Sequence, residues 1–214
     1  MIVVGLARRV ERVEALRTEV TELAAKHLHA IRCDITREED ILAAFREVEQ
    51  RFGGVDVLIN NAGIAVGDIT LFTPENTAQL RQVVDTNVLG LVLCSREAFL
   101  SMKKRSIDGH IVHINSVVGH SVPAFASFNI YPATKYGVTA LTETMRHELR
   151  MADTKIKSIS PGLVKTEAIP DAMKVGQTPI LEPEDIADAV LYVLATPPRV
   201  QVHELTIRPV GEMM

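Results

Sequence analysis

The sequence predicts a single α/β domain built on a doubly wound parallel sheet, and three observations support this prediction. Short apolar runs of strand length alternate along the chain with segments whose apolar residues recur at helical spacing. Repeated units of this kind are typical of a parallel sheet with helices on both faces. At 214 residues, with 47% apolar and 23% charged residues, the chain can bury one sizeable core. We therefore expect one domain over residues 1–214.

The first half of the chain is expected to form three strands and three helices. Apolar residues at helical spacing predict helices over residues 13–23, 41–52 and 80–99. Buried apolar runs between these helices predict strands over residues 2–7, 30–33 and 55–59.

The second half continues the alternation. Apolar runs predict strands over residues 111–115, 156–160 and 205–207. A helix is expected to start near Tyr131, because Val138, Leu141 and Met145 follow at helical spacing. Another is expected to open at Pro183, since proline favours the first helical position.

Composition excludes several classes of function. The net charge of −4 gives no reason to expect a nucleic acid or an anionic membrane as a partner. No apolar run approaches the ~18 residues of a transmembrane helix, and no secretory leader is recognisable. Cys33 and Cys94 are widely separated, which favours structural thiols in a reducing compartment. We therefore expect a cytoplasmic protein.

Ser116 and the segment Tyr131-Pro132-Ala133-Thr134-Lys135 form the most informative pattern in the chain. A tyrosine four residues before a lysine places a phenol and an ammonium on one helix face. Free tyrosine titrates near pH ~10, and a nearby positive charge lowers that pKa. The pair is a candidate acid/base centre, and a serine hydroxyl can hold a carbonyl oxygen. The spacing also arises by chance, so it indicates function only together with other residues.

Three further motifs accompany this pattern: Asn60-Asn61-Ala62-Gly63, Asn87, and Pro161-Gly162. In this order and spacing the chain resembles the short-chain dehydrogenase/reductase family from about Ile2 to Pro209. Within the family it looks most like the member 11-type enzymes, including insect farnesol dehydrogenases. The resemblance implies a Rossmann-like fold.

The resemblance also implies four catalytic roles. Tyr131 would be the proton donor or acceptor, Lys135 would lower its pKa and bind the cofactor ribose, Ser116 would position the substrate oxygen, and Asn87 would anchor a water. The Ser116–Tyr131 spacing is longer than in many family members, and we expect a loop over residues 119–123 to absorb it. Ser121 and Ser127 compete for the serine role, but Ser116 directly follows the expected strand end.

By the same resemblance, cofactor contacts are expected at the ends of three strands. Asp34 would bind the adenine amino group, although it could instead cap a helix ahead of Glu38. The remaining expected contacts are Ile35, Asn61, Ala62, Gly63, Pro161, Gly162, Val164 and Thr166, with Tyr131 and Lys135.

The first expected strand ends in Arg8-Arg9 and lacks a carboxylate at its tip. Relatives that use NAD usually place an acidic residue there to bind the ribose 2′-hydroxyl. Guanidinium groups bind phosphate with paired hydrogen bonds, so two arginines favour NADP. The alternative is a solvated helix start, although cations there oppose the helix dipole.

No glycine-rich phosphate loop occurs anywhere in the sequence, and Gly5 stands alone. Compared with the family, the first strand, that loop and the first helix are expected to be missing, which would remove a central strand of the sheet. Two functions follow as alternatives. The first is an NADP(H)-dependent oxidoreductase of hydrophobic alcohols and carbonyls, and the second is a truncated, catalytically silent homologue with a binding or assembly role.

The sequence gives little support for a metal site. His110 and His113 are three residues apart at a strand start and are expected to face opposite sides, and His27 and His29 lack a third ligand. An apolar wall of the substrate pocket is expected from Ala124, Phe125, Phe128 and Ile130, which suits an isoprenoid, retinoid, steroid or aliphatic substrate. A short substrate loop is expected over residues 167–181. The resemblance further implies a homodimer or homotetramer.

Overall fold

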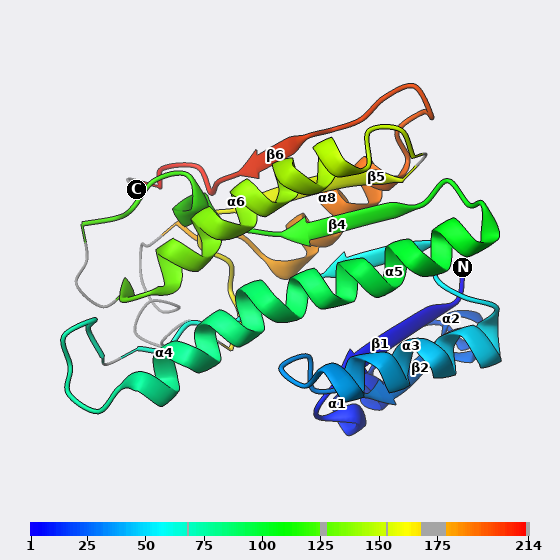
Figure 1. Cartoon of the computed structure of the whole chain (residues 1–214), viewed down its shortest axis with the longest axis horizontal. Helices are drawn as coiled ribbons and strands as arrows, with labels where there is room; N and C mark the ends of the chain where they lie inside the picture. Colours follow the sequence, from blue (N-terminus) through cyan, green and yellow to red (C-terminus); the bar gives the residue numbers. More distant parts are fainter. Residues whose placement is uncertain (68, 125–127, 153, 168–178, 213–214) are drawn as a thin grey trace.

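A computed structural model describes the chain except for residues 68, 125–127, 153, 168–178 and 213–214 (Figure 1). Strands and helices alternate, which confirms the α/β prediction. All strand pairs are parallel. The strands of the described chain are β1 (Val3–Ala7), β2 (Leu28–Arg32), β3 (Val57–Asn60), β4 (His110–Ile114), β5 (Lys155–Pro161) and β6 (Glu204–Ile207).

The strands form two separate sheets. One contains β1 and β2, and the other has the order β3-β4-β5-β6. In Figure 1 the sheet of β1 and β2 lies below the larger sheet. Within the described residues β1 pairs only with β2, so it does not close onto β3 to form one continuous sheet. The split lies where the family resemblance implies a missing central strand.

The helices follow the predicted order with one exception. They are α1 (Val10–Ala15), the 3₁₀ turn η1 (Leu16–Thr18), α2 (Glu22–Lys26), α3 (Glu38–Phe52), α4 (Thr77–Val84), the π-helical segment η2 (Asp85–Gly90), α5 (Leu91–Arg105), the 3₁₀ turn η3 (Val117–Gly119), α6 (Tyr131–Glu148) and α8 (Pro183–Leu194). The expected long helix over residues 80–99 is confirmed as the continuous series α4, η2 and α5.

The prediction of one helix over residues 13–23 is wrong. The segment is broken into α1, η1 and α2, and the Thr21 hydroxyl caps α2 by accepting a hydrogen bond from the Ala24 N–H at 3.3 Å. The apolar spacing does not mark a core face here, since Leu23 is 70% exposed and Leu16 and Val20 are also exposed. Without that burial, the threonine cap restarts the helix.

Helices cover both faces of the larger sheet, as predicted. Ile111 of β4 packs in a cluster with Ile41 of α3 and Met102 of α5. The next residue, Val112, points to the other face and packs with Val193 of α8. Alternate side chains of a strand point to opposite faces, so the two clusters are separate layers of the core.

Both cysteines are free and buried. Burial raises the pKa of Cys33 to about 11 and that of Cys94 to about 12, so neither thiol is reactive at neutral pH. This confirms their interpretation as structural thiols. In the part of the chain that the structure describes, no helix combines the length and apolar character needed to cross a membrane.

Candidate active site

The carboxyl ends of the parallel strands point in one direction, toward the left in Figure 1, and the candidate residues gather there. Ser116 follows β4 and caps the short turn η3. Tyr131 is the first residue of α6, which starts at this edge and runs back along the sheet. This placement is the usual position of ligand sites in parallel α/β sheets.

The Ser116 hydroxyl lies close enough to the Tyr131 phenol to act on its pKa, despite the long sequence spacing between them. The Ser116 hydroxyl also accepts a hydrogen bond from the Val118 N–H at 3.3 Å. Burial raises the pKa of Tyr131 above its ordinary value, and the Ser116 hydroxyl opposes that shift. The phenol is therefore protonated at neutral pH.

Lys135 lies one helical turn after Tyr131 and is 6% exposed. Its ammonium donates a hydrogen bond to the Ile114 carbonyl at 3.0 Å and lies 5.8 Å from the centre of the Tyr131 ring. Burial lowers the pKa of Lys135 to about 8. The expectation that this ammonium lowers the pKa of Tyr131 is wrong: burial raises that pKa, and the opposing effect comes from Ser116 and not from Lys135.

Asn87 lies in η2 and is almost fully buried. Its amide nitrogen donates to the Ile64 carbonyl at 2.9 Å and to the Thr134 hydroxyl at 3.1 Å, while its oxygen accepts from the Ile64 N–H at 2.8 Å. These bonds fasten the loop after β3 to α6. A Cβ added to Gly63 would lie 3.6 Å from the Asn87 oxygen and 3.7 Å from the Lys135 ammonium. Gly63, Asn87 and Lys135 therefore lie close together at this edge of the sheet.

Of the two competing serines, Ser121 is exposed and Ser127 lies outside the described residues, as does Phe125 of the expected apolar wall. The predicted substrate loop lies largely outside them as well. Phe128 and Ile130 are half-buried just before α6, and Ala124 is exposed.

A cavity of about 450 Å³ opens beside the tip of β1. Its lining carries three arginines and two aspartates, namely Arg8, Arg32, Arg37, Asp34 and Asp40, with Ala43. Burial alone would raise the pKa of Asp34, but hydrogen bonds from Thr36 and the charges of Arg8 and Arg37 lower it. The cavity therefore combines a carboxylate with a cationic rim.

Asp34 is not the cap of the following helix, because α3 begins at Glu38 and its cap residue is Arg37. The carboxylate instead accepts hydrogen bonds from the Thr36 N–H at 3.0 Å and the Thr36 hydroxyl at 2.8 Å. The carbonyl of Ile35 packs against Gly90 of η2, where an added Cβ would come within 2.7 Å of it. This contact joins the cavity loop to the element that carries Asn87.

The two arginines after β1 have different environments. Arg8 lines the cavity, whereas Arg9 points to Glu167, with a nitrogen–oxygen distance of 3.8 Å. Arg12 pairs with the same carboxylate at 2.6 Å. The structure therefore places Arg8, but not Arg9, in the lining of the cavity.

The remaining predicted contacts lie on two loops at the same edge. Asn61, Ala62 and Gly63 are exposed after β3. Pro161 ends β5, and the Gly162 N–H donates to the Ile207 carbonyl at 2.7 Å. Val164 forms an isolated bridge with Leu181, and Thr166 is exposed.

Sequence reasoning missed Arg32, Arg37 and Asp40 in the cavity, because charged residues on a strand end, a loop and a helix give no pattern that marks a common cavity. It also missed the environment of His113, which is fully buried. The two ring nitrogens of His113 lie 2.9 Å from the Thr142 hydroxyl and 3.3 Å from the Ser95 hydroxyl. Within the described ranges, no group of three metal-ligating side chains occurs.

Comparisons with known proteins agree with this arrangement. The family model described as short chain dehydrogenase matches residues 1–174. The chain is 63% identical over 214 residues to a farnesol dehydrogenase of Aedes aegypti, covering 99% of this chain and 87% of the relative. It is 45% identical to the dehydrogenase/reductase SDR family member 11 of Mus musculus, covering 99% and 85%. The solved closed form of serine dehydrogenase complexed with NADP⁺ superimposes with a TM-score of 0.86 at 28% identity, covering 100% and 87%.

Proposed function

This chain belongs to the short-chain dehydrogenase/reductase family, and we propose that it is an NADP(H)-dependent oxidoreductase that interconverts a hydrophobic alcohol and its aldehyde or ketone. The observation that carries this proposal is the approach of the Ser116 hydroxyl to the phenol of Tyr131, close enough to act on its pKa, with the Lys135 ammonium beside the same ring. A phenol, a hydroxyl and a cation at one point can bind a carbonyl oxygen and move a proton to it.

In the direction of reduction, the Ser116 hydroxyl donates a hydrogen bond to the substrate oxygen and Tyr131 delivers the proton. The raised pKa of Tyr131 keeps this proton on the phenol at neutral pH, which is the form that reduction requires. In oxidation the same phenol must first lose its proton, and the Lys135 charge stabilises the resulting phenolate. The nicotinamide, when bound, supplies or accepts the hydride.

The cavity beside β1 supports NADP as the cofactor. Arg8 and Arg37 supply guanidinium groups that match a ribose 2′-phosphate, and Asp34 supplies an acceptor for the adenine amino group. These residues fit an adenosine that carries an additional phosphate. The serine dehydrogenase that shares this fold also binds NADP⁺.

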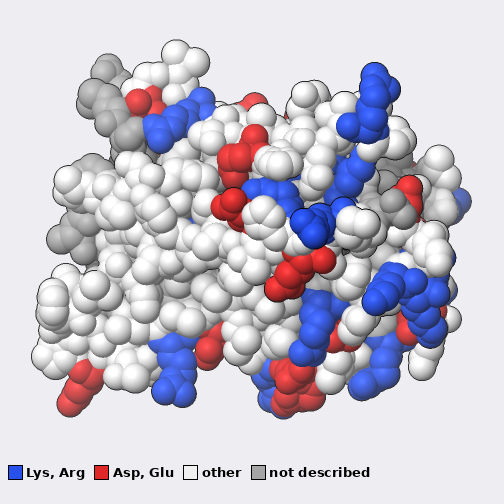
Figure 2. Space-filling model, turned by 45° about the horizontal axis from the view of Figure 1, so that its top comes forward, with Lys and Arg blue, Asp and Glu red and all other residues white. Residues whose placement is uncertain are grey.

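A hydrophobic substrate is supported by the surface at the carboxyl edge of the strands. In Figure 2 most charged side chains lie toward the right, whereas the left part, which corresponds to the carboxyl edge in Figure 1, is largely uncharged. Phe72, after β3, and Val122, after η3, are 93% and 62% exposed. Because the Aedes aegypti relative is a farnesol dehydrogenase, isoprenoid alcohols and aldehydes are the first substrates to test.

We also propose a homodimer or homotetramer that resides in the cytoplasm. Leu89, Leu100 and Tyr136 leave apolar surface exposed on the continuous η2–α5 helix and on α6, as expected of surfaces that pair in an oligomer. The two free, buried thiols suit a reducing compartment.

The decisive experiment compares Tyr131→Phe with the parent. The variant is expected to lose carbonyl reduction by 10²–10⁴-fold, since general acid catalysis typically contributes that much, and to retain NADPH binding. The readouts are steady-state reduction of an isoprenoid aldehyde and calorimetric titration of NADPH. Tyr136→Phe is the matched control, because Tyr136 is an exposed tyrosine of the same helix.

Turnover of Tyr131→Phe within threefold of the parent would refute Tyr131 as the proton donor. The catalytically silent alternative predicts no turnover in the parent with any isoprenoid, retinoid, steroid or aliphatic carbonyl.

A further inference from the structure

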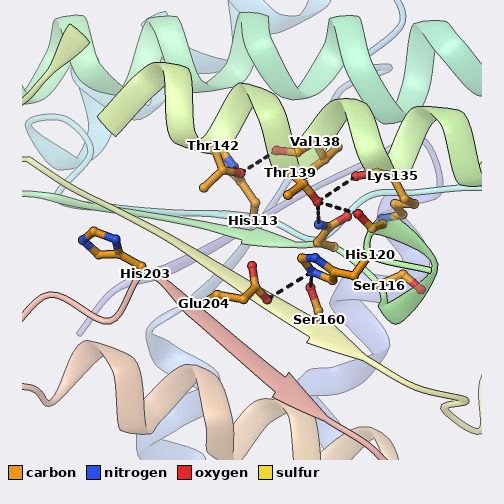
Figure 3. Close-up of polar contacts among 12 residues, drawn as sticks. His113, Ser116, His120, Lys135, Val138, Thr139, Thr142, Ser160, His203 and Glu204 are labelled. Carbon is orange, nitrogen blue, oxygen red and sulfur yellow. Dashed lines mark hydrogen bonds and ion pairs between the residues drawn. The ribbon is translucent and has the colours of Figure 1, made fainter. Parts of the chain in front are cut away.

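A second polar cluster joins the loop after Ser116 to the two strands on its far side (Figure 3). His120 directly follows η3, and its Nε2 lies 2.9 Å from the hydroxyl of Ser160 in β5. The same nitrogen lies 3.7 Å from a carboxylate oxygen of Glu204 in β6. Ser160 is fully buried, whereas the side chains of His120 and Glu204 are about one-third exposed. None of these residues belongs to the acid/base centre described above.

The geometry excludes a nucleophilic serine. In a serine–histidine–carboxylate relay the two ring nitrogens serve different partners, one the serine and the other the acid. Here a single nitrogen faces both Ser160 and Glu204. A fully buried Ser160 hydroxyl is also out of reach of a substrate. The cluster therefore does not perform covalent chemistry, and its role is to hold parts of the structure together.

The position of the cluster indicates what it holds together. Toward α6, the first turn after Ser116 is fixed by the Thr139 hydroxyl, which donates to the Gly119 carbonyl at 3.0 Å. On the side of β5 and β6, the same turn is fixed by the hydrogen bond between His120 and Ser160. Ser160 immediately precedes Pro161 and Gly162, where β5 ends.

We propose that His120 is a positioning residue, which through Ser160 fixes the catalytic Ser116 loop relative to the Pro161–Gly162 end of β5. This inference rests on the proposed function, in which Ser116 and Tyr131 hold the substrate oxygen, and on the expected contact of Pro161 and Gly162 with the cofactor. Hydride transfer requires a fixed distance between substrate and nicotinamide, and a misplacement of ~1 Å can cost ~10²-fold in rate.

Replacing His120 by glutamine or by asparagine distinguishes the loss of its hydrogen bond from the loss of side-chain volume. The amide of glutamine can occupy the place of Nε2 and bond to Ser160, whereas the shorter amide of asparagine cannot reach it. We expect His120→Asn to lower kcat at least tenfold while KM for NADPH changes less than threefold. We expect His120→Gln to retain kcat within threefold. His147→Asn, an exposed histidine of α6, is the control.

A double-mutant cycle with Ser160→Ala tests the route of the effect. If His120 acts through the Ser160 hydroxyl, combining Ser160→Ala with His120→Asn reduces kcat no further than His120→Asn alone. Additive losses, equal losses in the asparagine and glutamine variants, or an unchanged kcat in His120→Asn would each overturn the proposal.

A second readout keeps the inference testable apart from the proposed function. Hydrogen exchange of the backbone amides of Gly119, His120 and Ser121, measured without substrate, is expected to accelerate in His120→Asn and not in His120→Gln. A parent without turnover would refute the proposed function alone. Equal exchange in parent and His120→Asn would refute the positioning role whatever the turnover.

Discussion

The buried ammonium of Lys135 makes stability depend on pH. Burial lowers its pKa from the ordinary 10.5 to about 8 in the folded protein. Between these two pH values the unfolded chain binds more protons than the folded one, so the contribution of this residue to stability rises with pH. Below about pH 8 the group is protonated in both states. The burial of its charge then costs about 3 kcal/mol, since one pKa unit corresponds to about 1.4 kcal/mol.

We predict that Lys135→Met is more stable than the parent at pH 7 by about 1–3 kcal/mol, which is the burial cost less the lost hydrogen bond to Ile114. The advantage should shrink as pH rises from 8 to 10.5. The measurement is denaturant unfolding of both proteins at pH 7 and pH 10. A difference that does not vary with pH would contradict the buried charge. Lys157, whose pKa is also lowered to about 8, is present in both proteins and cancels from the comparison.

Arg8 and Arg9 provide a matched pair for cofactor preference. Arg8→Asp replaces a cation of the cavity with a carboxylate that repels a 2′-phosphate and can bind a 2′-hydroxyl. We expect its ratio of kcat/KM for NADPH over NADH to fall at least tenfold. Arg9→Asp should change the ratio less than threefold, because Arg9 faces Glu167. A parent that already favours NADH would refute the interpretation of the cavity.

At the scale of single residues, the sequence predicted which side chains lie together when they are close in the chain. Tyr131 and Lys135 share one helix, so their spacing alone puts them together. It could not predict the cavity position of Arg37 or the bond from His120 to Ser160, since both depend on how separate elements pack. Arg8 and Arg9 look alike in the sequence, and only the packing of Glu167 distinguishes them.

Among the elements, strands and core helices were predictable because a buried face dictates their apolar pattern. The helices α3, α6 and α8 lie where the spacing of their apolar residues predicts them. The segment from Val13 to Leu23 has the same spacing, yet its apolar side chains are largely exposed and the helix breaks. The π-helical turn η2 was not predictable, since it differs from α-helix only in its hydrogen bonds.

Two helical glycines test how η2 is held. A Cβ at Gly90 would lie 2.7 Å from the Ile35 carbonyl, a backbone atom that cannot move freely. A Cβ at Gly137 in α6 would meet nothing closer than 4.0 Å. We predict that Gly90→Ala destabilises the protein by about 1–3 kcal/mol and that Gly137→Ala stabilises it by up to about 1 kcal/mol. Thermal and urea unfolding of both variants measure this. Similar effects of the two substitutions would contradict the tight contact at η2.

On the scale of the whole molecule, the missing glycine-rich motif predicted the feature that the structure shows most clearly. The family resemblance implies a strand between β1 and β3, and these two strands are the edges at which the sheet is divided. Neither edge is paired within the described chain. The candidate catalytic residues are unaffected by the division. Asn87, Ser116 and Tyr131 lie on segments that connect strands of the larger sheet.

The division of the sheet predicts a specific pattern of hydrogen exchange. The Val3 N–H donates to the His27 carbonyl, so Val3 faces β2; the His110 N–H donates to the Asp56 carbonyl, so Asp56 faces β4. Successive backbone N–H groups of a strand point to opposite sides. The amides of Val4 and Ile59 therefore point toward the gap between the two sheets. The amide of Val112, in a strand paired on both sides, lies in the interior of the larger sheet.

We expect the amides of Val4 and Ile59 to exchange at least 10²-fold faster than that of Val112, because an edge amide without a strand partner needs no cooperative unfolding to meet solvent. Residue-resolved exchange by NMR at neutral pH is the measurement. The amide of Gly5, which faces β2, is the control on the same strand and should exchange more slowly than that of Val4. Protection of Val4 and Ile59 equal to that of Val112 would mean that backbone pairing joins the two sheets in solution, and the divided topology would then be wrong.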